Sequence, residues 1–320
     1  MNGDLTLESA IHPFDTPCHY CADTAEAFRL IPGTSVVALH GPARARFYVA
    51  HTSPVRCLAT TQAAGVAATA AGVGASWELY VWKPTTLTQI VALSPPTEGN
   101  AGALAALSFS HDGERLIGVQ HGASPRALLW RWRSDSTAAE VVCPHLSMPG
   151  PTAWALCLPD APSGHVQLLT ANAQMLRFWV ASSEGEGSLH PADASPAADA
   201  QGATCVLEVP TPPVEGAANG GRGGGGALVV SAHSSGGLRA WRLWQGAGQA
   251  ATADQVGLVR SVSGHQGAAL ALASCGAERA QVASGGADGL VRLWTAYLDP
   301  VRTINLAHCW AANPMLTRIT

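Results

Sequence analysis

The segment from Gly264 to Trp294 is the part of the chain that most constrains its fold. It reads GHQGAALALASCGAERAQVASGGADGLVRLW. A Gly-His pair precedes an apolar strand, a second strand ends in Ser-Gly-Gly, and an Asp-Gly turn leads to a third strand that ends at Trp294. This order predicts a β-hairpin with a neighbouring strand. Because one small sheet cannot bury both of its faces, we expect it to stack against copies of itself.

Five strands that end in tryptophan predict these copies. They read WELYVW, RALLW, QMLRFW, GGLRAW and GLVRLW, and they end at Trp82, Trp130, Trp179, Trp241 and Trp294. Successive tryptophans are 48, 49, 62 and 53 residues apart. The longest interval contains two insertions, near 181–202 and 212–226, the second of which is a glycine-rich run. With these insertions set aside, the repeat is regular.

The repeat resembles a WD40 propeller blade, which has four strands in about 40 to 45 residues. The resemblance implies a hydrogen-bonded tetrad of His265, Ser284, Asp288 and Trp294, in which Asp accepts from His, His meets Ser, and Ser meets the indole N–H. Such a network satisfies buried polar groups and makes the sheet rigid. A catalytic Ser-His-Asp arrangement is the alternative interpretation. The structural network is favoured because it recurs in enzymatically inert propellers.

The other predicted blades keep this network only in part. His51 precedes the strand VRCLAT in the blade that ends at Trp82, but the enlarged turn AGVGASWE lacks the Asp. In the blade of Trp241, His233 stands where the Asp is expected. Around Trp130 and Trp179 no tetrad can be assembled from the sequence. These blades are therefore expected to depend mainly on apolar packing.

Several further segments resemble, in order, the first atypical propeller of the echinoderm microtubule-associated protein-like family, whose members carry a HELP motif and two tandem propellers. They are FRLIPGTSVVALH, YVAHTSPVRCLAT, WELYVWKPTTLTQIVAL, ALLWRWRSD and ANAQMLRFW. The similarity runs from about Phe28 to Trp294. The basic coiled coil that commonly precedes the propeller in this family and the second propeller are both missing. The sequence is therefore expected to be a fragment, a truncated gene model or a reduced paralogue.

The predicted fold is all-β, a WD40 β-propeller of four-stranded antiparallel blades that is incomplete or atypically closed. Residues 1–27 form a partly irregular N-terminal segment, residues 28–306 the propeller, and residues 307–320 a tail. The propeller includes an irregular first blade from about Phe28 to Tyr48 and an outer strand from Val301 to Leu306. With 320 residues, 47% of them hydrophobic, a folded domain needs no disulfide framework.

Charge and composition argue against several classes of protein. The net charge is −4, and the 18 basic residues are spread singly, so no nucleic-acid-binding tract is visible. The start of the chain lacks the features of a signal peptide, and no apolar run reaches the 18 residues of a membrane span. We expect a reducing, intracellular setting in the cytoplasm or on the cytoskeleton.

Candidate chemical sites are few. Cys18 and Cys21 have C-x-x-C spacing, with His12 and His19 nearby, but a zinc site needs four ligands. Zinc and redox chemistry are the two alternatives to an ordinary cysteine pair. The glycine-rich segments GVGASW and GGRGGGGA lack the Lys-Ser/Thr of a phosphate loop. The sequence thus predicts no catalytic residue, no metal site and no cofactor.

Two functions follow from the resemblance. The first is a non-catalytic module that binds tubulin or axonemal, centriolar or spindle proteins. The second is a general WD40 scaffold in another intracellular complex, such as a ubiquitin ligase or a trafficking assembly. Fold alone does not decide between them, because function resides in the surface used.

Overall fold

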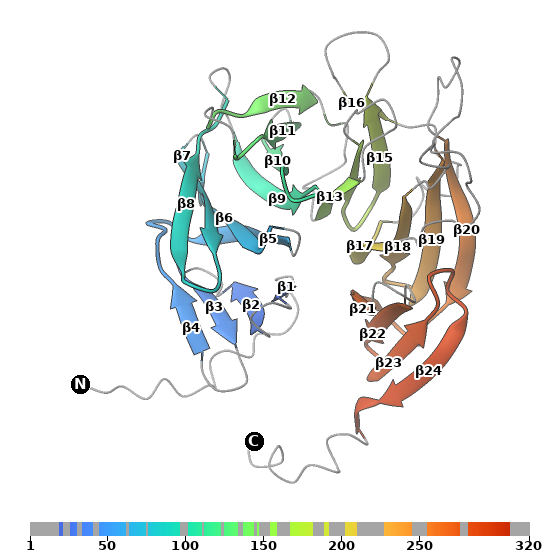
Figure 1. The fold of residues 1–320 in the computed structure, drawn as a ribbon. Helices are drawn as coiled ribbons and strands as arrows, with labels where there is room; N and C mark the ends of the chain where they lie inside the picture. Colours follow the sequence, from blue (N-terminus) through green and yellow to red (C-terminus); the bar gives the residue numbers. More distant parts are fainter. Residues whose placement is uncertain are drawn as a thin grey trace, which may run out of the picture. The chain divides into compact units, whose positions relative to one another are not determined.

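A computed structural model describes most of the strands of this chain (Figure 1). The described residues are 19–21, 26–30, 34–40, 45–61, 64–74, 76–96, 102–110, 112–122, 125–133, 137–143, 146, 154–158, 167–181, 189–191, 202–209, 227–244, 255–275 and 281–307. They form six four-stranded sheets, and within each sheet the strands follow one another in sequence order. Every paired neighbour is antiparallel.

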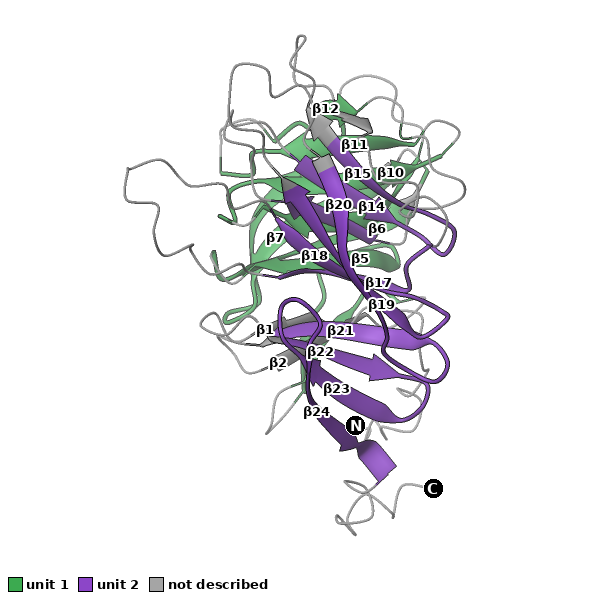
Figure 2. Cartoon of the chain, turned by 90° about the vertical axis from the view of Figure 1, so that its right-hand side faces the viewer, with its two compact units in different colours: residues 1–147 green, residues 148–320 purple. Residues whose placement is uncertain are grey.

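The chain divides into two compact units, residues 1–147 and 148–320 (Figure 2). Unit 1 contains three sheets. Their strands are β1 (His19–Cys21), β2 (Glu26–Leu30), β3 (Val37–His40) and β4 (Ala45–Tyr48); β5 (Val55–Thr61), β6 (Val66–Val73), β7 (Ser76–Lys83) and β8 (Thr88–Leu93); and β9 (Ala103–Phe109), β10 (Leu116–His121), β11 (Arg126–Trp130) and β12 (Glu140–Cys143).

Unit 2 contains the other three sheets. Their strands are β13 (Trp154–Leu158), β14 (Gln167–Ala171), β15 (Leu176–Ala181) and β16 (Leu189–Pro191); β17 (Cys205–Val209), β18 (Leu228–Ala232), β19 (Gly237–Trp244) and β20 (Gln255–Ser263); and β21 (Ala269–Cys275), β22 (Gln281–Gly286), β23 (Leu290–Trp294) and β24 (Pro300–Asn305).

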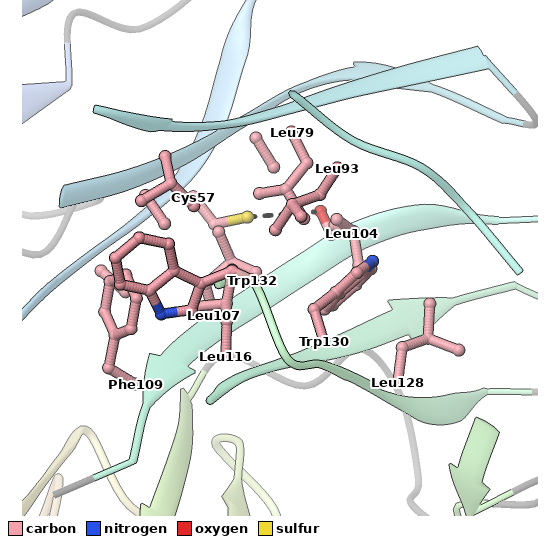
Figure 3. Close-up of a cluster of buried hydrophobic side chains, with 14 of the residues drawn as sticks. Cys57, Leu79, Leu93, Leu104, Leu107, Phe109, Leu116, Leu128, Trp130 and Trp132 are labelled. Carbon is pink, nitrogen blue, oxygen red and sulfur yellow. Dashed lines mark hydrogen bonds between the residues drawn. The ribbon is translucent and has the colours of Figure 1, made fainter. Parts of the chain in front are cut away.

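Hydrophobic side chains pack between consecutive sheets within each unit. In unit 1, one cluster joins the β5–β8 sheet to the β9–β12 sheet and includes Leu79, Leu104, Leu116 and Trp130 (Figure 3). In unit 2, one cluster lies between the β13–β16 and β17–β20 sheets, and another between the β17–β20 and β21–β24 sheets. Each sheet therefore buries apolar surface against its neighbour in the sequence, which is how repeated small sheets become stable.

The middle strands are covered on both faces. All five residues of β14 and all five of β18 are buried. In β6 the small residues Ala67, Ala68, Ala70 and Ala71 are all at most 1% exposed. Alanine has little intrinsic preference for strands, so close packing between sheets determines this element.

The prediction of an all-β chain built from four-stranded antiparallel sheets is confirmed. The arrangement is consistent with a β-propeller-like fold. The expected outer strand at Val301 to Leu306 is β24, shifted by one residue at each end. No helix in the described part of the chain has the length and hydropathy that a membrane span requires.

The first sheet differs from its prediction. The expected start at Phe28 falls inside β2, and the sheet that contains β2 begins at His19. The strand β1 pairs with β2 from His19 opposite Phe28 to Cys21 opposite Glu26. A three-residue strand is too short to show a hydrophobic period, so the sequence did not indicate it. The two predicted insertions lie outside the described residues except for β16 and a few flanking positions, and so does the tail from residue 308 onward.

Candidate functional site: buried histidine and tryptophan networks

The structure brings together the four residues of the tetrad in the β21–β24 sheet. His265 precedes β21, Ser284 lies on β22, Asp288 lies in the turn after β22, and Trp294 ends β23. The Nδ1 atom of His265 lies 2.9 Å from Asp288 Oδ1, and its Nε2 atom lies 2.7 Å from Ser284 Oγ. The indole Nε1 of Trp294 donates to Ser284 Oγ over 2.8 Å. The three contacts form one continuous chain.

The direction of this chain follows from its donors. An indole N–H only donates, so Ser284 Oγ accepts from Trp294 and is free to donate its own proton to His265 Nε2. On the other side of the ring, His265 Nδ1 lies 2.9 Å from Asp288 Oδ1 and 2.9 Å from Arg292 Nη1. Each buried polar atom in the chain has a partner, which is the condition for such a network to stabilise a sheet.

Asp288 is the most heavily bonded carboxylate of this sheet. The backbone N–H groups of Gln266 and Leu290 donate to it over 3.1 and 3.2 Å, and Arg292 Nη1 donates to Oδ2 over 2.9 Å. Burial alone would raise the pKa of Asp288, but the hydrogen bonds from His265, Arg292 and the two backbone groups hold it well below its usual value. The carboxylate therefore remains ionised and fixes the imidazole.

The alternative interpretation of these residues as a catalytic triad disagrees with their burial. Ser284 is 0% exposed, and its oxygen already bonds both Trp294 and His265. A nucleophilic serine must reach a substrate carbonyl, which this hydroxyl cannot do without disrupting the sheet. The geometry is that of a structural network.

A second network of the same shape lies in the β5–β8 sheet. His51 Nε2 lies 2.7 Å from Thr69 Oγ1, and Trp82 Nε1 donates to the same oxygen over 3.1 Å. His51 Nδ1 lies 3.2 Å from Glu78 Oε2. Glu78 also accepts from the backbone N–H and the hydroxyl of Thr52. The turn of this blade lacks the Asp, and Glu78 of β7, which the sequence did not indicate, supplies the carboxylate instead.

Glu78 replaces the aspartate because its side chain is longer. It lies within β7, opposite Ala71 of β6, and not in the turn itself. Burial raises its pKa, but the hydrogen bonds from Thr52 and His51 lower it further than burial raises it. The signal that could have found it is a carboxylate near the start of the third strand, four residues after the turn residue Gly74, together with a histidine before the first strand.

A third network lies in the β17–β20 sheet, and it assigns His233 a different role from the predicted one. His233 was expected at the position of the aspartate. Its Nε2 lies 2.9 Å from Ser231 Oγ, which also accepts from Trp241 Nε1 over 2.8 Å. Its Nδ1 lies 3.0 Å from the carbonyl oxygen of Gly202. His233 thus replaces the histidine of the tetrad, and a backbone carbonyl replaces the carboxylate.

The remaining two tryptophans have simpler partners. Trp179 Nε1 donates to Thr170 Oγ1 over 2.7 Å, and Thr170 is fully buried. Trp130 Nε1 donates to the backbone oxygen of Ser94 over 2.9 Å. The register explains the difference, because the position on β10 that corresponds to the hydroxyl residue is Gly118. A Cβ at Gly118 would lie 2.8 Å from the Trp130 ring, so the indole occupies the space that a serine side chain would need.

The five predicted tryptophans occupy equivalent positions. Trp82, Trp130, Trp179, Trp241 and Trp294 lie on the third strand of their sheets, and a fourth strand follows each of them. All are at most 5% exposed. Each tryptophan therefore fixes its third strand in the core, and the fourth strand forms the outer edge of the sheet.

The predicted cysteine pair near the N-terminus lies largely outside the described residues. Cys18 and His12 lie outside the described residues, and Cys21 and His19 are described only as part of the backbone of β1. The described cysteine side chains at positions 57, 143, 157 and 205 are buried and reduced. Burial raises the pKa of Cys205 to about 11, so this thiol is unreactive. Among the described residues, no group of three or more His, Cys, Asp or Glu side chains could hold a metal ion.

Comparison with known proteins gives no assignment. No protein-family model matches the chain, and no curated protein matches it.

Proposed function

We propose that this protein is a WD40-type β-propeller, incomplete or atypically closed, that acts as a non-catalytic protein-interaction module. The observation that carries the proposal is the recurrence of one buried network at equivalent positions of several sheets. Four tryptophans donate to a buried threonine or serine on the preceding strand, and three of those hydroxyls also bond a histidine. This repetition supports a scaffold role, because an active site is needed once and a packing device is needed in every repeat.

The partner that we propose is tubulin or a microtubule-based assembly in a cilium, centriole or spindle. The support is the ordered sequence resemblance from about Phe28 to Trp294. Bulk charge gives no attraction to an acidic microtubule, because the chain itself carries a net charge of −4. The contacts are therefore specific ones on the propeller surface. For these 320 residues by themselves we expect micromolar or weaker affinity, equivalent to about −8 kcal/mol or less.

Co-sedimentation with polymerised tubulin tests this proposal, together with pull-down of the soluble tubulin dimer and localisation of a fluorescent fusion. We expect binding that changes only modestly with salt, since shape and hydrogen bonds dominate it. Circular dichroism establishes that each preparation is folded. If a folded protein fails in all three assays, the cytoskeletal proposal is wrong and the general scaffold takes its place. Affinity purification with mass spectrometry would then identify the complex.

A further inference from the structure

The last sheet of unit 2, β21–β24, packs on the β17–β20 sheet through one of its two faces. Val282 and Trp294 lie on that face, in the hydrophobic cluster that joins the two sheets. Side chains alternate between the two faces of a strand, so the residues next to these lie on the opposite face, here called the outer face. At its centre are Ala283 and Gly285 on β22 and Val291 and Leu293 on β23.

The preceding sheet buries the residues at the same four positions. Counted from the network serine on the second strand and from the tryptophan on the third strand, these residues are Val230, Ala232, Leu238 and Ala240. All four are 0% exposed and belong to the cluster beneath the β21–β24 sheet. Their four counterparts on the outer face are partly exposed. The outer face therefore repeats the apolar pattern of a covered sheet, but it is open.

Gly285 and the neighbouring side chains show this openness directly. A Cβ at Gly285 would have one atom within 4 Å, the Cβ of Ala271 in the same sheet, at 3.8 Å. Of the nine large hydrophobic side chains that are well exposed in the described part of the chain, four lie on this sheet or directly beside it: Leu270, Tyr297, Val301 and Leu306. Apolar exposure is therefore concentrated around this sheet, as is typical of an interaction surface.

We propose that the outer face is the contact of a two-fold symmetric dimer formed with a second copy of this chain. The sizes of the side chains across the sheet support this occupant. The strands lie side by side in the order β21, β22, β23, β24 (Figure 2). The register adds the exposed Ala271 and Ala273 of β21 to the outer face at one side, and Ile304 and Arg302 of β24 at the other. Side chains are thus small on the first two strands and large on the last two.

A two-fold axis parallel to the strands, between β22 and β23, makes this face complementary to itself. It places β21 and β22 of one copy opposite β24 and β23 of the other, so small side chains face large ones. Two sheets that pack about 10 Å apart need such interdigitation, because two uniformly large or uniformly small faces would leave clashes or voids. Arg302 lies on the edge strand, so its guanidinium group can extend past the contact into water.

The size of the face predicts a weak dimer. Four strands about 4.8 Å apart and about six residues long cover roughly 400 Å² of sheet. Two copies then cover about 800 Å² in total, which is less than the roughly 1,200 to 2,000 Å² of stable interfaces and typical of transient ones. We therefore expect a dissociation constant in the micromolar range. This inference goes beyond the proposed function and does not depend on it, because no other protein takes part.

Sedimentation velocity of the full chain from about 1 to 200 μM tests the proposal. We expect the mean mass to rise with concentration from that of a monomer to that of a dimer and no further, because a two-fold contact is closed. Ala283→Arg puts a charge at the centre of the contact, opposite the second copy's β23, and should weaken dimerisation at least about tenfold. Val291→Thr keeps the shape but adds a hydroxyl group, and should weaken it about threefold.

The matched control is Ala92→Arg, the same substitution at an exposed alanine on β8, outside the contact. It should change the dissociation constant by less than about twofold. Thermal unfolding of each variant shows that it is folded.

Three results would overturn the proposal. The folded wild type could remain monomeric at every concentration, which would leave the outer face to a partner of different sequence. The mass could continue to rise beyond that of a dimer, which would indicate an open, head-to-tail contact. Finally, Ala92→Arg could dissociate the dimer as strongly as Ala283→Arg, which would place the contact elsewhere.

Discussion

Asp288 is the residue that holds the complete tetrad in place, and its removal should be costly. In Asp288→Ala, His265 Nδ1 and the backbone N–H groups of Gln266 and Leu290 lose their acceptor. Leaving such donors unsatisfied costs about 1 to 3 kcal/mol. We expect this decrease in the free energy of unfolding, measured by urea denaturation at pH 7.

Glu140→Ala is the control for this measurement. Glu140 is a carboxylate whose side chain is 56% exposed, at 4.0 Å from Arg131. Its loss should change the free energy of unfolding by no more than about 0.5 kcal/mol. Equal stability of Asp288→Ala and the wild type would mean that the network contributes nothing. The depressed pKa of Asp288 also means that its contribution is present above about pH 4 and is lost as the pH falls further.

Glu208 gives the opposite pH dependence. Its pKa rises from about 4.3 in an unfolded chain to about 7 in the fold, so the folded state favours the protonated acid. The favourable contribution is therefore present at low pH and is lost as the pH rises toward and past 7. Glutamine does not titrate, so Glu208→Gln does not lose this contribution as the pH rises. The free energy of unfolding of the variant, relative to that of the wild type, should therefore increase by about 2 kcal/mol between pH 5 and pH 8.

Urea unfolding of both proteins at the two pH values measures this difference. Burial also lowers the pKa of His51 and of His233, against the opposing effects of Glu78 and the Gly202 carbonyl, so both side chains contribute to the pH dependence. They are common to the wild type and the variant, so their contributions largely cancel in the comparison. A stability difference that stays constant with pH would show that Glu208 does not titrate as described.

At the scale of the strand, Gly118 explains why the β9–β12 sheet lacks the tryptophan–hydroxyl hydrogen bond of the other sheets. It occupies the hydroxyl position of β10, where a Cβ would lie 2.8 Å from Trp130 and 3.0 Å from Leu104. Gly118→Ser therefore forces the indole to move and does not complete a network. Overpacking of this kind costs about 1 to 3 kcal/mol. We expect a lower midpoint of thermal unfolding.

Thr170→Ser is the matched control, since it retains the hydroxyl that accepts from Trp179 and removes one methyl group. It should cost less than Gly118→Ser. A stabilised Gly118→Ser variant would show that the β9–β12 sheet can accommodate the hydroxyl, contrary to the packing described above.

The strands also show what the sequence could predict. Five of the six third strands were found from their buried tryptophans, because a large buried side chain at a fixed period is a strong signal. The first strand of the chain and the role of His233 were not found. His233 depends on a carbonyl 31 residues earlier, and only the folded backbone brings Gly202 to it. Glu78 was not predicted because the carboxylate of the tetrad was expected in the turn, whereas this longer side chain reaches the same imidazole from β7.

For the whole molecule, the sequence predicted an all-β chain of four-stranded antiparallel sheets from the repeated strand pattern, and the structure has this class of fold. Within each unit the sheets stack on their neighbours in the sequence. The same stacking determines stability, because the clusters in each unit join neighbouring sheets. In proteins of this kind stability is approximately a sum over repeats and their nearest-neighbour interfaces.

The two units should therefore fold when they are separated. Residues 1–147 and 148–320 each retain three complete four-stranded sheets and hydrophobic clusters of their own. We expect each fragment to give a β-type circular dichroism spectrum and a cooperative urea transition. The control divides the chain after Glu114, which separates β9 from β10 within one sheet and exposes its buried strand edges. Those two pieces should aggregate or remain partly unfolded. If the fragments 1–147 and 148–320 behave no better than this control, stability depends on contributions that the clusters within each unit do not supply.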